Sequence, residues 1–77
     1  MTFEEAKNWA IDRSKIYTPD QKVSLIVCKW NDSYIVQDTK FILQHIKEYE
    51  VGELVFCTNE SQFQEILSSN FGVNIIN

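Results

Sequence analysis

The chain has 77 residues, too few for two independent cores, so we expect one compact domain over 1–77. Hydrophobic residues make up 44% and aromatic residues 13% of it, which excludes disorder by composition. The formal net charge of -4 argues against direct nucleic-acid binding, because phosphate contacts need clustered cations. We expect a cytoplasmic protein without membrane contact, since the sequence has neither a signal peptide nor a membrane-length apolar run.

The first predicted element is a helix over 3–16. Thr2 and Glu5 have capping-box spacing, in which each side chain accepts a hydrogen bond from the other's backbone N–H. The residues that follow helical spacing are Phe3, Ala6, Trp9, Ala10, Arg13, Ile16 and Tyr17. Trp9 lies on the apolar face of this helix, so we expect it in the core. Pro19 ends the helix, because the residue before a proline is pushed out of the helical region.

A β-hairpin is predicted next. Residues 22–30 are apolar on both alternating faces and rich in branched side chains, which is typical of a strand covered on both faces. Residues 31–33 favour a turn and residues 34–36 resume strand character. The alternative is a longer helix that begins at Thr18 and Pro19.

The second half of the chain predicts helices and strands in alternation. Asp38 or Thr39 caps a second helix that Gly52 stops, and an apolar strand follows over 54–57. The buried face of this helix is expected to hold Phe41, Ile42, His45, Ile46 and Tyr49.

A third helix completes the alternation. Thr58 or Asn59 caps it, Gly72 ends it, and a last short strand is expected over 73–76. Its buried stripe is expected to hold Phe63, Ile66 and Leu67.

These elements predict the α/β (mixed α and β) class in the order αββαβαβ. We expect a mixed sheet of four strands with helices on its faces, because strands joined through one helix usually run parallel while the hairpin is antiparallel. The last strand would then lie at an edge, where it could pair across a dimer axis.

The residues that could carry chemistry form no assembled motif. Cys28 and Cys57 lie in apolar runs, where free cysteine commonly packs as a small hydrophobic residue. His45 with Glu48 one turn later could bind a metal or act as a base, or could pack at the edge of the core. The two cysteines and His45 lack zinc-site spacing. We therefore expect no catalytic residue, no metal and no cofactor.

The candidate partner-binding residues begin at the hairpin. Trp30 and Tyr34 flank its turn, with Asn31 and Asp32 between them. Aromatic residues beside an exposed polar tip are favoured at protein contacts, because they contribute a large apolar area at low entropic cost. The alternative is that both rings cover the sheet edge or cap the core.

Glu48, Glu50 and Glu53 form an acidic cluster further along the chain. Such a cluster is either a solvated surface or an imitation of phosphate groups that a basic partner binds. We include Glu48 and Glu50 in the candidate partner-binding set.

Two strand ends in 23–76 carry a further pattern. One apolar strand closes on Val27-Cys28-Lys29, and after a helix a second leads into Thr58-Asn59, with Phe63 one turn later and a closing strand at 73–76. This order resembles the later half of the restriction-endonuclease-like core, in its Mrr-type branch. The resemblance implies a degenerate nuclease core, because Val27 stands where that family has a metal-binding acid or glutamine.

Three functions remain open from the sequence. The first is a non-enzymatic protein-binding module, a small inhibitor or regulator of a larger protein or ribonucleoprotein machine, similar in style to phage or mobile-element anti-defence proteins such as anti-CRISPR proteins. The second is a reduced nuclease-like or nucleic-acid-processing domain, to which Lys29 and an acid such as Asp20 would contribute. The third is a homodimeric structural subunit.

Overall fold

The structure is a computed structural model that describes residues 1–17 and 23–71. In chain order the elements are α1 (Phe3–Ser14), β1 (Leu25–Trp30), β2 (Ser33–Asp38), α2 (Thr39–Gln44), the 3-10 turns η2 (Ile46–Glu48) and η3 (Val51–Glu53), β3 (Leu54–Cys57) and α3 (Glu60–Asn70). The predicted mixed α and β class is confirmed, and the chain folds as one small compact domain.

The sheet differs from the prediction in strand number and order. Over the described residues it has three strands in the order β2-β1-β3, and both hydrogen-bonded pairs are antiparallel. The strands β2 and β3, which α2 connects, do run parallel to each other, but β1 lies between them. β1 takes the central position because it is apolar on both faces. The expected fourth strand at 73–76 and the proline turn before β1 fall outside the described residues.

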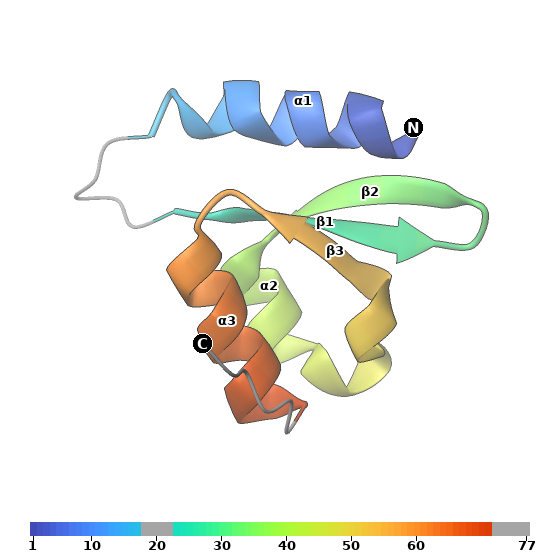
Figure 1. Cartoon of the computed structure of the whole chain (residues 1–77), viewed down its shortest axis with the longest axis vertical. Coiled ribbons are helices and arrows are strands. Elements are labelled where there is room, and N and C mark those ends of the chain that lie inside the picture. Colours follow the sequence, from blue (N-terminus) through green and yellow to red (C-terminus); the bar gives the residue numbers. More distant parts are fainter. Residues whose placement is uncertain (18–22, 72–77) are drawn as a thin grey trace.

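Helices cover both faces of the sheet, with α1 on one face and α2 and α3 on the other (Figure 1). Leu25 and Val27 pack with α1, whereas Ile26 and Cys28 pack with residues of α2, β3 and α3. Alternation along one strand thus supplies two hydrophobic clusters, which we call the α1-side cluster and the α3-side cluster. The prediction that this strand is covered on both faces is confirmed.

The helix starts follow the predicted caps. Thr2 and Glu5 form the capping box of α1: the Thr2 N–H donates to Glu5 Oε1 at 2.9 Å, and the Glu5 N–H donates to Thr2 Oγ1 at 3.2 Å. Asp38 caps α2, and Asn59 caps α3 by accepting from the Gln62 N–H at 3.0 Å. These side chains satisfy backbone donors that a helix start leaves unpaired.

The second helix is shorter than predicted, because it ends at Gln44 rather than near Gly52. At His45 the backbone turns to φ -119° and ψ 26°, and its N–H is shared between the carbonyls of Phe41 and Ile42 at 3.1 Å each. Such sharing marks the change from α-helix to 3-10 geometry. The 3-10 turns that follow bury Tyr49, which is 7% exposed, against the sheet.

No helix within residues 1–17 and 23–71 is both long and apolar enough to cross a membrane. The cytoplasmic location stays a prediction.

Candidate protein-binding surface

Trp30 is the last residue of β1, and its side chain is 48% exposed. Because it alternates with Ile26 and Cys28, it lies on the α3 side of the sheet. Its ring packs against that of Tyr49, with centroids 6.3 Å apart and planes tilted by 57°. The buried tyrosine holds the exposed indole in place.

The segment that supplies Tyr49 brings further residues to the same end of the sheet. η3 directly precedes β3 and lies against β1, and its Val51 is 41% exposed. We define the Trp30 surface as the apolar residues Trp30, Tyr49 and Val51 together with the acids Asp32, Glu48, Glu50 and Glu53.

The electrostatic environment of this surface is negative. Burial raises the pKa of Tyr49, and its neighbours Cys28, Glu48 and Glu53 raise it further. Burial, with a smaller contribution from Glu53, raises the pKa of the Cys28 thiol to about 12. Burial is the main cause of both shifts, and Glu53, which contributes to both, disfavours a further negative charge beside these groups.

The β1–β2 turn directly follows Trp30 in the chain. Trp30 and Ser33 are paired across the hairpin, so the turn itself is Asn31 and Asp32. Asn31 has φ 54°, the left-handed conformation that asparagine tolerates better than most residues. Asp32 is exposed at the tip of the turn.

The acids of the Trp30 surface differ in their local bonding. The Glu50 N–H donates to Glu53 Oε1 at 2.8 Å, which draws the Glu53 side chain back to the residue that precedes η3. Glu48 Oε2 lies 3.4 Å from Nδ1 of His45, whose ring lies 4.4 Å from that of Phe41 between centroids. Glu50 is an exposed acid beside the buried Tyr49.

Tyr34 does not join the other candidate residues. Its ring lies 5.6 Å from that of Phe3 between centroids, and it packs against the α1-side cluster. Its backbone N–H donates to the carbonyl of Met1 at 3.0 Å. The structure therefore brings Trp30 together with Asn31 and Asp32, and places Tyr34 on the opposite face of the sheet.

The second tryptophan is also exposed, contrary to the prediction that it lies in the core. α1 packs on the sheet through Ala6 and Ala10, both 0% exposed, and this orientation leaves Trp9 on the flank of the helix at 48% exposure. Arg13 lies over the Trp9 ring at 5.8 Å from its centroid. Lys7 lies in the same way over Phe56, at 5.5 Å.

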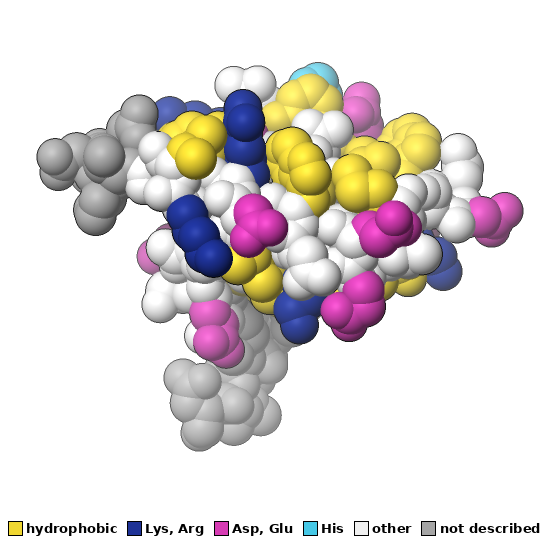
Figure 2. Space-filling view, turned by 90° about the horizontal axis from the view of Figure 1, so that it is seen from above, with side chains coloured by type: hydrophobic (Ala, Val, Ile, Leu, Met, Phe, Trp, Pro, Cys, Tyr) yellow, Lys and Arg dark blue, Asp and Glu magenta, His cyan; other side chains and the backbone are white. Residues whose placement is uncertain are grey.

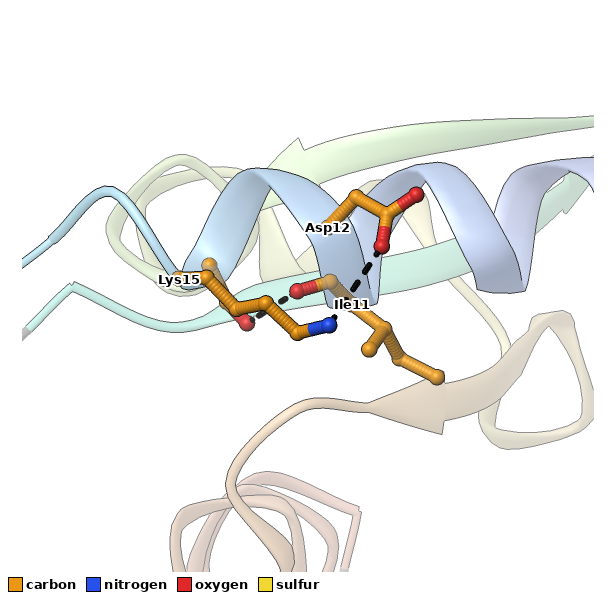
Figure 3. Close-up of polar contacts among 4 residues, drawn as sticks. Ile11, Asp12 and Lys15 are labelled. Atoms are coloured by element: carbon orange, nitrogen blue, oxygen red, sulfur yellow. Dashed lines mark hydrogen bonds and ion pairs between the residues drawn. The ribbon is translucent and has the colours of Figure 1, made fainter.

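The α1 face carries charges of both signs among its hydrophobic side chains (Figure 2). At the end of α1, Lys15 Nζ lies 3.6 Å from Asp12 Oδ1 (Figure 3). These two side chains are 71% and 78% exposed, so their ion pair contributes little to stability.

The groups considered for catalysis are divided between the two faces of the sheet, with the two cysteines on the α3 side and Lys29 on the α1 side. Cys28 and Cys57 are free thiols in the α3-side cluster, and burial raises the pKa of both. Over the described ranges, no group of three or more His, Cys, Asp or Glu residues could hold a metal ion. Lys29 is exposed and pairs with Tyr34, while Val27 before it is buried under α1.

Comparison of the chain with family models, curated proteins and solved structures gives no match. The resemblance to a restriction-endonuclease-like core stays a prediction. Sequence reasoning did not include Tyr49 and Val51 in the site, because it assigned this segment to a continuous helix. The available signal was Val51, a branched apolar residue between Glu50 and Gly52 in an acidic segment.

Proposed function

We propose that this chain is a non-enzymatic protein-binding module, which uses the Trp30 surface to bind a larger basic protein as a small inhibitor or regulator does. The observation that carries the proposal is the half-exposed indole of Trp30, held on the buried ring of Tyr49.

A tryptophan in this setting is suited to binding for two reasons. Tryptophan supplies a large contact area and is enriched among the residues that dominate interface energies. Packing on Tyr49 also restricts the ring before binding, so little further side-chain entropy is lost when a partner covers it.

The acids around Trp30 suggest the sign of the partner's charge. Asp32 at the turn and Glu48, Glu50 and Glu53 beside Tyr49 give a negative surface. Such a surface speeds encounter with a positively charged cleft and disfavours acidic partners. A basic protein, or the protein part of a ribonucleoprotein machine, is the partner that fits; an anti-defence role stays a prediction.

The positions of the two thiols support a binding role over a catalytic one. Thiolate is the reactive form of cysteine, and a pKa raised to about 12 leaves Cys28 protonated at neutral pH. Both cysteines instead fill the core beneath the Trp30 surface.

The test is capture of partners from a lysate by the tagged protein, with bound protein and nucleic acid both identified. We compare the wild type with Trp30→Ala, and use Trp9→Ala as the matched control because the two tryptophans are equally exposed at 48%. We expect wild type and Trp9→Ala to capture one protein in stoichiometric amount, and Trp30→Ala to bind it at least about tenfold more weakly.

Circular dichroism of each variant establishes that the fold is kept. Equal capture by a folded Trp30→Ala variant would remove the Trp30 surface from the proposal. Recovery of nucleic acid alone would favour the nuclease-like alternative, and recovery of the chain with itself alone would favour the homodimer.

A further inference from the structure

We infer that the partner seats a cationic side chain, an arginine or lysine of a basic segment, on the exposed indole of Trp30. This inference rests on the proposed function and names the chemical group that the Trp30 surface recognises.

The first argument is the contrast with two other aromatic side chains, those of Trp9 and Phe56. Arg13 lies over Trp9 and Lys7 lies over Phe56, at 5.8 and 5.5 Å from the ring centroids. Within residues 1–17 and 23–71, no lysine or arginine lies over the ring of Trp30. Tryptophan is the aromatic side chain that attracts a cation most strongly.

The second argument is charge complementarity. The nearest cation along β1 is Lys29, which pairs with Tyr34 and lies on the α1 side of the sheet, away from Trp30. The acids near Trp30 are instead Asp32, two residues further along in the turn, and Glu53 of η3, the segment that lies against β1. A partner cation here gains from the ring and from the carboxylates together, and both interactions strengthen when the interface excludes water.

A second copy of this chain fits this position less well than a basic partner. Arg13 is the single arginine of the sequence and already lies over Trp9, so a second copy could offer a guanidinium only by breaking that contact. Its net charge of -4 also makes two copies repel each other.

The experiment measures binding of two fluorescently labelled peptides by anisotropy. One peptide alternates arginine with glycine; the other has citrulline in place of arginine, which keeps the shape and most hydrogen-bonding groups but removes the charge. The proteins are the wild type, Trp30→Leu and the matched control Trp9→Phe. Trp30→Leu keeps every acid of the surface, so it separates the ring from general electrostatic attraction.

We expect the wild type and Trp9→Phe to bind the arginine peptide at least about threefold more tightly than the citrulline peptide. In Trp30→Leu this preference should shrink by about twofold or more. Equal binding of the two peptides, no binding of either, or a preference that Trp30→Leu leaves unchanged would each overturn the inference.

These outcomes are distinct from those of partner capture. If capture depends on Trp30 while the two peptides bind equally, the proposed function stands. The inference that the partner binds Trp30 through a cationic group is then wrong. If the arginine preference depends on Trp30 while capture does not, the surface binds cations but is not the surface that contacts the captured protein.

Discussion

The two tryptophans are equally exposed, at 48%, yet their surroundings are opposite. Trp9 lies on the flank of α1 with the guanidinium of Arg13 over its ring. Trp30 lies at the end of β1, next to the turn that holds Asp32, with the ring of Tyr49 against it. The comparison teaches that exposure alone does not identify a binding residue: the neighbours decide whether a ring is already covered or is open to a partner.

The two faces of the sheet differ in the same way. On the α1 side two alanines bring the helix close to the sheet, and the charged side chains of α1 cover aromatic rings. On the α3 side the larger residues Ile26, Ile42 and Ile66 form the core, and Trp30 stands at its margin. The following variants test whether the two regions differ as described.

The largest effect is expected at Ile26, which is 0% exposed in the α3-side cluster that supports Tyr49. Ile26→Ala should lower the free energy of unfolding by about 2–5 kcal/mol, because it removes buried methyl groups and leaves a cavity. Ile26→Val, the matched control, should cost about 0.5–1.5 kcal/mol. Urea denaturation measures both, and equal losses would contradict a tightly packed support for Trp30.

A smaller loss is expected where α1 meets the sheet. Ala10 is 0% exposed, so Ala10→Leu should force the helix outward and lower the free energy of unfolding by about 1–3 kcal/mol. The control is Asn8→Leu, an exposed position on the same helix, which should stay within about 0.5 kcal/mol of the wild type. Equal free energies of unfolding for the two variants would mean that α1 is loosely docked on the sheet. The position of Trp9 on the flank of α1 would then not be fixed.

The features that sequence predicted correctly depend on local rules. The cap at Thr2 was predicted outright, and those at Asp38 and Asn59 were each one of two predicted positions, because a cap depends on a side chain and the backbone a few residues away. The covering of β1 on both faces follows from the apolar side chains that it carries on each face. The sheet of three described strands was not predictable in this way, because β1 inserts between β2 and β3 through long-range contacts.

The candidate site was predicted in part for the same reason. Trp30 and the acids were identified by residue type, whereas the contact between Trp30 and Tyr49 depends on where α2 ends. The separation of Tyr34 from Trp30 had a sequence signal: a two-residue turn pairs Trp30 with Ser33, so the next residue must face the other side. Trp9 was misplaced because Ala6 and Ala10, which are smaller, decide the face that docks.

The turn beside Trp30 should show an intermediate effect. Asn31 has φ 54°, so the branched side chain of Asn31→Val should lower the free energy of unfolding by about 1–2 kcal/mol. Asn31→Gly, which adopts this conformation freely, is the control and should change the value by only a few tenths of a kcal/mol. Equal values for valine and glycine in urea denaturation would mean that the turn does not hold Trp30 in place.

The smallest effect is expected for the cation over Trp9. Arg13→Ala should lower the free energy of unfolding by less than about 1 kcal/mol, and it should make Trp9 more accessible to an uncharged fluorescence quencher such as acrylamide. The quenching is measured in a Trp30→Phe background, so that Trp9 alone is observed.

The matched control for this variant is Lys15→Ala, since Lys15 pairs with Asp12 rather than with a ring. We expect Lys15→Ala to leave the quenching of Trp9 unchanged, because its ion pair is exposed to solvent. If acrylamide quenches the fluorescence of Trp9 to the same extent in both variants, Arg13 does not cover the Trp9 ring. The two tryptophans would then no longer differ in whether a cation covers the ring. The inference that a partner's cation binds Trp30 would rest on the acidic neighbours of Trp30 alone.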